Sequence, residues 1–260
     1  MADRININCD MGESFGRWRL GNDAELMRYI PTINVACGFH AGDPHVMRQT
    51  VELAVGVGVE IGAHPALPDI LGFGRRRLQI SGEELKDYIV YQVGALQGFA
   101  HAAGVRLSHV KPHGALYAMC GESAELAVAL LEAARALDPE MIVIVGGPSI
   151  PAASAATGVR AVPEGYVDLA YQPNGFPVLE RAKRTWDPED VAERAVRIVR
   201  ERRLEAVDGS PLTIDVPTFC VHGDAPNAVE VARAVRERLA REHIEVVRLG
   251  AVVGHSLARR

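Results

Sequence analysis

The chain has 260 residues, 48% of them hydrophobic, so it can bury a large core. A net charge of −5 gives no general electrostatic attraction to nucleic acid or to an anionic membrane surface. With no such attraction to large anionic partners, small polar molecules are the expected ligands. No apolar run approaches the ~20 residues that a membrane-spanning helix needs.

The N-terminal segment enters a strand pattern without the charged and apolar regions of a secretory signal peptide. The four cysteines are widely spaced and form no C-x-x-C pair, which is typical of free thiols in a reducing compartment. They are Cys9, Cys37, Cys120 and Cys220. We therefore expect a cytoplasmic protein.

Short apolar runs alternate with amphipathic helical runs along the chain, and this alternation indicates a parallel sheet. The predicted strands are Arg4–Cys9, Thr32–Ala36, Val59–Ala63, Leu107–Val110, Met141–Val145, Val159–Val162 and Val216–Val221, with Glu245–Leu249 as one candidate more. No linker or low-complexity run divides the sequence. A single domain over residues 1–260 is therefore predicted.

The predicted helices are marked by their first residues and by their apolar period. Ser81 and Glu84 have the spacing of a capping box, and Asp187 and Pro226 stand at the starts of two further helices. Another helix is predicted over Val46–Val57.

Two connections are long and irregular. The first runs from His64 to Ile80 and contains three consecutive arginines that begin at Arg75, and the second runs from Tyr166 to Thr185. A connection of this length in a compact fold is usually functional, so we interpret the first as a loop that covers a site.

Ionisable side chains stand just past most of the predicted strands. Because the carboxyl ends of parallel strands meet at one edge, these side chains are expected to converge. They are Asp10 and Glu13, His40 and Asp43, His64, Lys111 and His113, Glu164, and His222 and Asp224. The other histidines, His109 among them, are assigned to structural or surface roles. Asp43 precedes a proline and is also expected to cap the next helix.

This set of side chains favours hydrolysis of an amide-like bond. Histidines can exchange protons near pH 7, carboxylates can orient them or activate water, and a lysine can neutralise an oxyanion or a phosphoryl group. The predicted catalytic residues are Asp10, His40, His64, Lys111 and His113. The predicted substrate-binding residues are Glu13, Asp43, Arg75, Glu164, His222 and Asp224.

A metal-dependent reaction is the alternative. Asp10, His40 and His113 could hold a divalent metal ion that generates hydroxide, although no H-E-x-x-H spacing is present. The sequence also has no G-x-S-x-G elbow of a serine hydrolase and no G-x-x-x-x-G-K-[ST] phosphate loop.

Six sequence blocks resemble those of the LamB/YcsF family, in the same order and over almost the whole chain. The blocks are Asn8–Gly16, Asn34–Pro44, Gly62–Pro65, Gly72–Arg76, His109–Tyr117 and Cys220–Asp224. The resemblance implies a seven-stranded (β/α) barrel related to the glycoside hydrolases and deacetylases. It also implies the A subunit of an ATP-dependent 5-oxoprolinase, which opens 5-oxo-L-proline to L-glutamate together with separate B and C subunits.

The resemblance leaves three questions of function open. The absence of a phosphate loop means either a non-standard ATP site or a contribution from a partner. The segment Glu164–Tyr171 has Leu169 where the family pattern has arginine, and the block that follows is matched only loosely by Val178–Arg181. The competing hypotheses are a metal-dependent deacetylase or amidohydrolase that acts alone, and a subunit that holds substrate without catalysing.

Overall fold

The computed structural model describes residues 3–178 and 184–254. The chain forms two compact units. Unit 1 comprises Met1–Cys9, Gly21–Thr32 and Glu164–Arg260, and unit 2 comprises Asp10–Leu20 and Ile33–Pro163. The first strand, β1 (Arg4–Met11), passes from unit 1 to unit 2 after Cys9.

Unit 2 is built on parallel strands in the order β6-β5-β4-β3-β2. Their bounds are β2 (Thr32–Ala36), β3 (Glu60–His64), β4 (His109–Val110), β5 (Ile142–Ile144) and β6 (Ala161–Val162). Every residue of β2, β3, β4 and β5 is buried. A parallel sheet buried in this way needs helices between its strands, and the sequence supplies at least one between each pair of consecutive strands from β2 to β6.

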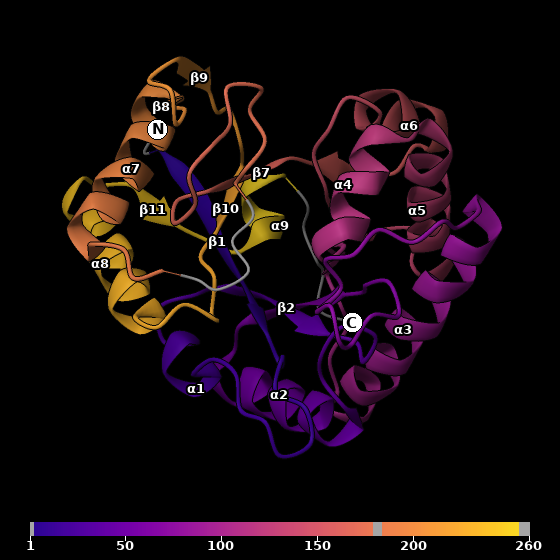
Figure 1. Ribbon diagram of the computed structural model, residues 1–260. Coiled ribbons are helices and arrows are strands. Elements are labelled where there is room, and N and C mark those ends of the chain that lie inside the picture. The colour runs from indigo at the N-terminus through magenta and orange to yellow at the C-terminus, as the bar shows by residue number, and fades with distance from the viewer. Residues whose placement is uncertain (1–2, 179–183, 255–260) are drawn as a thin grey trace. The chain divides into compact units, whose positions relative to one another are not determined.

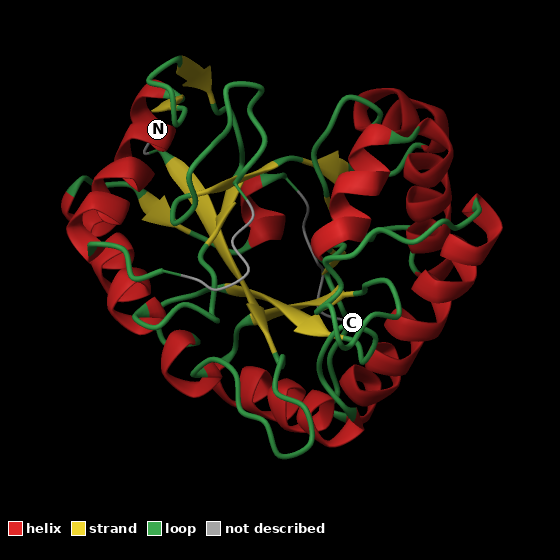
Figure 2. Cartoon of the chain, viewed as in Figure 1, coloured by secondary structure: helices red, strands yellow, loops and turns green. Residues whose placement is uncertain are grey.

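The helices of unit 2 are α2 (Pro44–Val57), α3 (Gly82–Ala102), α4 (Gly114–Glu122), α5 (Ala124–Leu137) and α6 (Ile150–Thr157). Ser81 and Glu84 form the predicted capping box of α3. Asp43 caps α2, because its carboxylate accepts the backbone N–H groups of His45 and Val46. Helices α3 and α5 pack side by side (Figure 1). The connections between the helices are drawn in green in Figure 2.

Unit 1 contains β1 up to Cys9, with β10 (Thr218–Cys220) parallel to it and β7 (Glu164–Tyr166) parallel to β10. The short strand β11 (Glu245–Val246) pairs with β1 as well, and β8 (Arg203–Glu205) and β9 (Pro211–Thr213) form a separate antiparallel pair.

Strand β1 carries buried amides on one face. Asn6 donates to Thr32 Oγ1 at 2.7 Å and to the Val247 carbonyl at 2.8 Å, and Asn8 donates to Thr218 Oγ1 at 2.9 Å. Thr218 Oγ1 in turn donates to Asn6 Oδ1 at 2.7 Å. These hydrogen bonds satisfy polar groups that would otherwise be buried at a cost.

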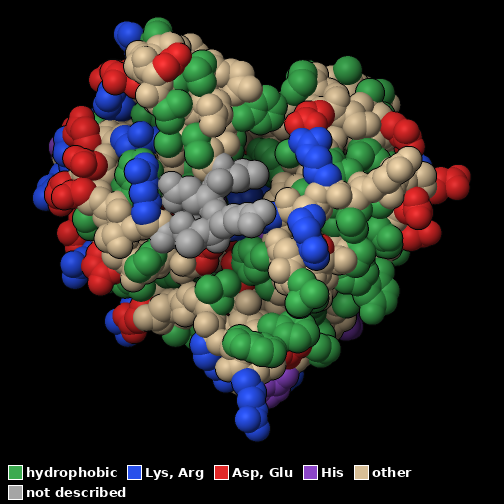
Figure 3. Space-filling view, in the orientation of Figure 1, with side chains coloured by type: hydrophobic (Ala, Val, Ile, Leu, Met, Phe, Trp, Pro, Cys, Tyr) green, Lys and Arg blue, Asp and Glu red, His purple; other side chains and the backbone are tan. Residues whose placement is uncertain are grey.

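The helices of unit 1 are α1 (Asp23–Leu26), α7 (Pro188–Glu201), α8 (Ala228–Arg241) and α9 (Leu249–Val252). Helices α7 and α8 pack against each other through apolar faces. Their outer faces carry charges of both signs (Figure 3), and Arg238 of α8 pairs with Glu193 of α7. Mixed charge of this kind is a solvated surface rather than a patch for a charged partner.

The predicted strands are all present, although several are shorter than predicted. The implied number of seven strands is wrong: in the described residues five strands of unit 2 and three of unit 1 make eight, with β11 as a short addition. The strand missed in this sheet is β7, whose three residues carry no recognisable strand pattern, and the separate pair β8 and β9 was not predicted either. Glu164 consequently begins a strand instead of following one. The loosely matched block Val178–Arg181 lies largely outside the described residues.

No single helix in the described ranges is long and apolar enough to cross a membrane. Helices α4 and α5 meet that test only as a pair, which is bent by 115°. The cytoplasmic location stays a prediction.

Candidate active site

Unit 2 brings six of the predicted residues into one buried centre. Asp10 lies near the end of β1, His64 ends β3, and Lys111 and His113 follow β4. His40 comes from the turn after β2, and Glu13 follows β1. Five of these side chains are buried, and that of Asp10 is only 12% exposed.

The imidazoles of His64 and His113 face each other. His64 Nδ1 lies 2.7 Å from the Lys111 carbonyl, and His113 Nε2 lies 2.8 Å from the Phe73 carbonyl. A carbonyl oxygen only accepts, so both of these nitrogens carry a proton. The remaining nitrogens, His64 Nε2 and His113 Nδ1, are 2.9 Å apart, and a hydrogen bond between them requires one further proton.

His40 lies parallel to His113. Their ring centroids are 3.8 Å apart with an interplanar angle of 7°, and His40 Nε2 is 3.0 Å from Glu13 Oε1. Burial lowers the pKa of both histidines well below the ordinary value, and the neighbouring imidazoles lower it further. Both rings are therefore neutral near pH 7, which is the state in which two imidazoles can stack closely.

The Asp10 carboxylate is held by one donor in β2 and one just after β4. Lys111 Nζ donates to Asp10 Oδ1 at 3.0 Å, and Asn34 Nδ2 donates to the same oxygen at 2.7 Å. His64 Nε2 lies 3.3 Å from Asp10 Oδ2. A buried carboxylate and ammonium in contact stabilise each other's charge, so this pair places a fixed negative and a fixed positive group beside the histidines.

Behind Asn34 lies His109, whose side chain is fully buried. His109 Nε2 is 2.7 Å from Asn34 Oδ1, and His109 Nδ1 is 2.7 Å from Ser108 Oγ. Burial lowers the pKa of His109 to about 3. His109 was predicted to be structural. Its contact with Asn34, which in turn contacts Asp10, was not anticipated.

The connection after β3 holds Phe73 against the centre. Asp69 is buried and accepts the backbone N–H of Gly72 at 2.9 Å and the guanidinium of Arg76. Phe73 has a φ of 53°, a left-handed conformation that is uncommon outside glycine, and this turns its carbonyl toward His113. Its ring packs edge-on against His40 and His113. The predicted covering loop is thus anchored at the centre by a strained residue.

The other predicted residues of unit 2 are placed as follows. Asp43 caps α2 and also accepts the Gly16 N–H at 2.8 Å, and these backbone hydrogen bonds lower its pKa. Arg75 lies over the Phe73 ring at 5.2 Å. Burial raises the pKa of the nearby Cys37 thiol to about 12, so it is no thiolate nucleophile at neutral pH.

Unit 1 holds the remaining predicted residues. Glu164 accepts from Asn8 Nδ2 at 3.2 Å and from the Tyr166 hydroxyl at 3.0 Å. His222 Nδ1 lies 2.8 Å from Asp168 Oδ1, and the backbone N–H of His222 donates to the other oxygen at 2.7 Å. Asp168 therefore orients the His222 ring.

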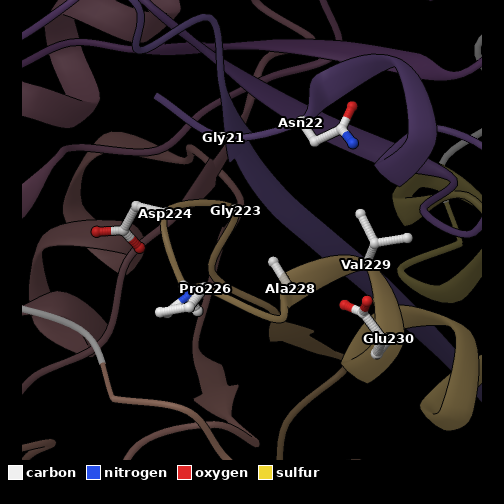
Figure 4. A pocket seen from close by; sticks show the side chains of 9 residues that line it. Gly21, Asn22, Gly223, Asp224, Pro226, Ala228, Val229 and Glu230 are labelled. Carbon is white, nitrogen blue, oxygen red and sulfur yellow. The ribbon is translucent and has the colours of Figure 1, made fainter. Parts of the chain in front are cut away.

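Asp224 lines a cavity of about 440 Å³ in unit 1. Figure 4 shows it in the turn after β10, across from Asn22 and Glu230, with Gly21 and Gly223 at the wall. The segment Glu164–Tyr171, which departs from the family pattern at Leu169, is held by α7. Arg194 of that helix donates to the carbonyls of Val167 and Leu169.

Sequence reasoning missed Asn34, Ser108, His109, Asp69 and Asp168. Asn34 had a recognisable signal, because a polar residue in the middle of an apolar strand needs a buried partner. Asp69 had none, since nothing in an irregular loop shows which carboxylate turns inward.

Four of the buried groups could also hold a metal ion. Donor atoms of Glu13, His40, His64 and His113 all lie within 4.8 Å of one another. Imidazole nitrogens and a carboxylate are suitable ligands for zinc and similar ions, and the carbonyls that fix His64 and His113 are the outer partners that metal-bound histidines usually have. This group shares His40 and His113 with the predicted trio, and Asp10 as a metal ligand stays a prediction.

Parallel strands that alternate with helices make the fold a (β/α) barrel, and a deacetylase is among its structural neighbours. A deacetylase solved with its substrate aligns with 98% of this chain and 93% of its own, at a TM-score of 0.50 and 11% identity, which supports the fold alone. The LamB/YcsF family matches residues 5–254, and the chain belongs to this family.

Several relatives are similar to this chain over almost their whole length. The A subunit of 5-oxoprolinase from Pyrococcus furiosus is 44% identical over 95% of this chain and 98% of its own, and the protein of the same name from Syntrophobacter fumaroxidans is 45% identical over 95% and 99%. The crystal structure of a "lactam utilization protein" from Thermus thermophilus has a TM-score of 0.86 and 40% identity, covering 94% of this chain and 99% of that one.

Proposed function

We propose that this chain is the A subunit of an ATP-dependent 5-oxoprolinase, which hydrolyses 5-oxo-L-proline to L-glutamate. The observation that carries the proposal is the buried centre of unit 2, in a family whose relatives bear that name over nearly their whole length. The B and C subunits are the proposed partners.

The chemistry of a lactam explains the need for ATP. A five-membered cyclic amide is unreactive, and transfer of a phosphoryl group to its oxygen would create a leaving group. Water must then add to the carbonyl carbon, and the C–N bond must break as the ring nitrogen takes up a proton. A second water must cleave the resulting acyl phosphate, which releases phosphate and leaves the carboxylate of glutamate. The reaction therefore needs a base, an acid and a positive group for the developing oxyanion.

The centre of unit 2 contains candidates for each role. Asp10 is the proposed base for water, and Lys111 the positive group, because the two are already in contact at 3.0 Å. His64 and His113 face each other at 2.9 Å and are the proposed proton carriers. Neutral His40 completes the set of catalytic residues.

The remaining predicted residues are proposed to bind substrate. Glu13 reaches His40 from the edge of the centre, and Arg75 is carried on the covering loop. For Glu164, His222 and Asp224 of unit 1, and for Asp43 of unit 2, a role in substrate binding stays a prediction. For ATP this chain offers no phosphate loop, so its site is either of a different kind or shared with a protein partner.

The direct test is glutamate release from 5-oxoproline and ATP, measured with this chain alone and with the B and C subunits added. We expect turnover in the complete mixture, and none without ATP. Asp10→Asn should reduce it by about 10²–10⁴-fold. Asp87→Asn, an exposed substitution on α3, is the matched control and should leave it unchanged. A complete mixture without activity rejects the proposal.

A metal-dependent hydrolase that acts alone is the second candidate, favoured by the convergence of Glu13, His40, His64 and His113. A divalent ion held there would supply a water of lowered pKa as nucleophile. Metal analysis of the purified protein, together with His113→Ala, separates the two candidates. Bound zinc that is lost in the variant, with turnover independent of ATP, supports this second candidate.

A third reading is a subunit that holds substrate while the chemistry takes place elsewhere. If His40→Ala and His113→Ala left turnover of the reconstituted complex intact, this reading would replace the first.

A further inference from the structure

A chain of buried polar side chains leads from Ser108 to Asp10 within unit 2. Ser108 Oγ, His109 and the Asn34 amide follow one another at separations of 2.7 Å, and Asn34 Nδ2 is 2.7 Å from Asp10 Oδ1. The side chains of Asn34 and His109 are fully buried, and Ser108 is 2% exposed. Each contact in the chain therefore needs a proton from one of its two members.

The direction of the chain follows from the group at its end. An ionised carboxylate only accepts, so Asn34 must present its amino group to Asp10 and its oxygen to His109. His109 Nε2 must then carry the ring proton, and the bare Nδ1 accepts from the Ser108 hydroxyl.

The reverse direction is disfavoured by the surroundings. It would place Asn34 Oδ1 against Asp10 Oδ1, which is tolerable only if Asp10 is protonated. Lys111 Nζ, 3.0 Å from the same oxygen, favours the ionised carboxylate. The Ser108 hydroxyl would have to donate to the Ile61 carbonyl instead, and that contact is longer, at 3.2 Å.

We propose that His109 is a positioning residue for Asp10: the Nε2–H tautomer, supported by the Ser108 hydroxyl, orients the Asn34 amide so that it donates to the Asp10 carboxylate. The proposal rests on the proposed function for the role of Asp10 as the base. Gly62 makes room for the ring, since a Cβ at that position would lie 2.2 Å from His109 Nε2.

The first test does not depend on activity. Nitrogen-15 NMR of the histidine rings distinguishes the two tautomers, because a bare ring nitrogen resonates far from a protonated one, and the His109 signals are assigned by their loss in His109→Gln. We expect the Nε2–H tautomer at neutral pH. The Nδ1–H tautomer or a charged ring overturns the proposal, whatever reaction the protein catalyses.

The second test uses a conservative pair of variants in the reconstituted enzyme. His109→Leu removes the donor to Asn34 and should lower kcat by about 10- to 100-fold with little change in KM. His109→Gln can still donate from its amide and should restore most of the loss. His101→Leu, at an exposed site near the end of α3, is the control. Equal losses in His109→Gln and His109→Leu, or a loss confined to KM, contradict a positioning role.

Discussion

The stacked pair of His40 and His113 depends on the absence of a side chain at residue 74. A Cβ built on Gly74 would lie 2.8 Å from His113 Cδ2 and 2.9 Å from His40 Cβ, and Gly74 has a φ of 64°. Both the space and the backbone conformation therefore require glycine here.

Gly74→Ala should consequently displace the imidazoles. We expect a loss of catalytic rate of roughly tenfold or more, because misplacement of reacting groups by about 1 Å is costly. Gly98→Ala is the matched substitution, since nothing lies within 4 Å of a Cβ at that helical position. It should leave activity unchanged and raise the free energy of unfolding by about 1 kcal/mol, measured by urea denaturation. A Gly74→Ala enzyme with full activity would show that the stack has no part in turnover.

The sequence predicted the residue types of the centre better than their contacts. Asp10, His64 and Lys111 were identified because they follow apolar strands, and unit 2 brings them together. The tautomers of His64 and His113 could not be predicted, because they depend on carbonyl groups of residues 111 and 73 whose direction is set by the folded backbone. Asp43 was identified as a cap by local chemistry alone, and the capping prediction is confirmed.

At the scale of elements, the buried centre of unit 2 depends on the conformation of the connection after β3. Asp69 is the only acidic residue of this turn. Its carboxylate accepts the Arg76 guanidinium and the backbone N–H groups of Gly72 and Arg76, and these hydrogen bonds hold the pKa of the carboxyl below its ordinary value. The backbone N–H of Gly74 donates to the Asp69 carbonyl at 2.9 Å. One residue thus organises the turn from Asp69 to Arg76.

Asp69→Ala should loosen this turn without unfolding unit 2. Hydrogen exchange of the amides of Gly72, Gly74 and Arg76 should become faster, while exchange in α3 stays slow. Turnover should fall with it, since the Phe73 carbonyl would no longer be held against His113. Arg77→Ala, which removes an exposed ion pair with Glu122, is the comparison and should leave the three amides protected. Unchanged exchange in Asp69→Ala would mean that other contacts hold the turn.

Elements with a strong local signal were predicted closely, and short ones were not. The capping box of α3 and the predicted start of α7 at Asp187 located the first residues of these helices to within one position. The strand β7 and the pair β8–β9 escaped prediction because three-residue strands are defined by the neighbours they pair with, and not by a period within their own sequence.

At the scale of the whole molecule, the single domain stays a prediction, and we propose that the two units unfold together. The chain passes between them several times, and β1 belongs to both. Thermal unfolding of a Trp18→Phe variant, followed by circular dichroism and by the fluorescence of the remaining Trp186 in unit 1, should give one coincident transition. Two separated transitions would show that the units are independent domains.

The stability of the protein should fall in mild acid. The pKa of His109 is about 3 in the folded chain and near 6.5 when unfolded, so between these values the unfolded chain binds more protons. The free energy of unfolding should decrease as the pH falls below about 6.5, by up to about 1.4 kcal/mol per pH unit for this histidine. It should be insensitive to His109 above that pH. Buried His40 and His113 act in the same direction.

Urea denaturation between about pH 7.5 and about pH 5 measures this slope. His109→Gln should reduce this slope by the contribution of one titrating proton, while substitution of exposed His101 should leave the slope unchanged. An equal slope in His109→Gln would mean that the ring takes up its proton as readily in the folded protein as in the unfolded chain.

The buried amides of β1 have a consequence for how the strand finds its place. Alternating apolar residues distinguish the two faces of a strand. A slip by two residues preserves that alternation, so apolar packing alone would not select against it. Such a slip would part Asn6 and Asn8 from Thr218 together, stranding several buried polar groups at once. Polar residues inside the sheet therefore fix the register of β1, and with it the position of Asp10 near the end of the strand.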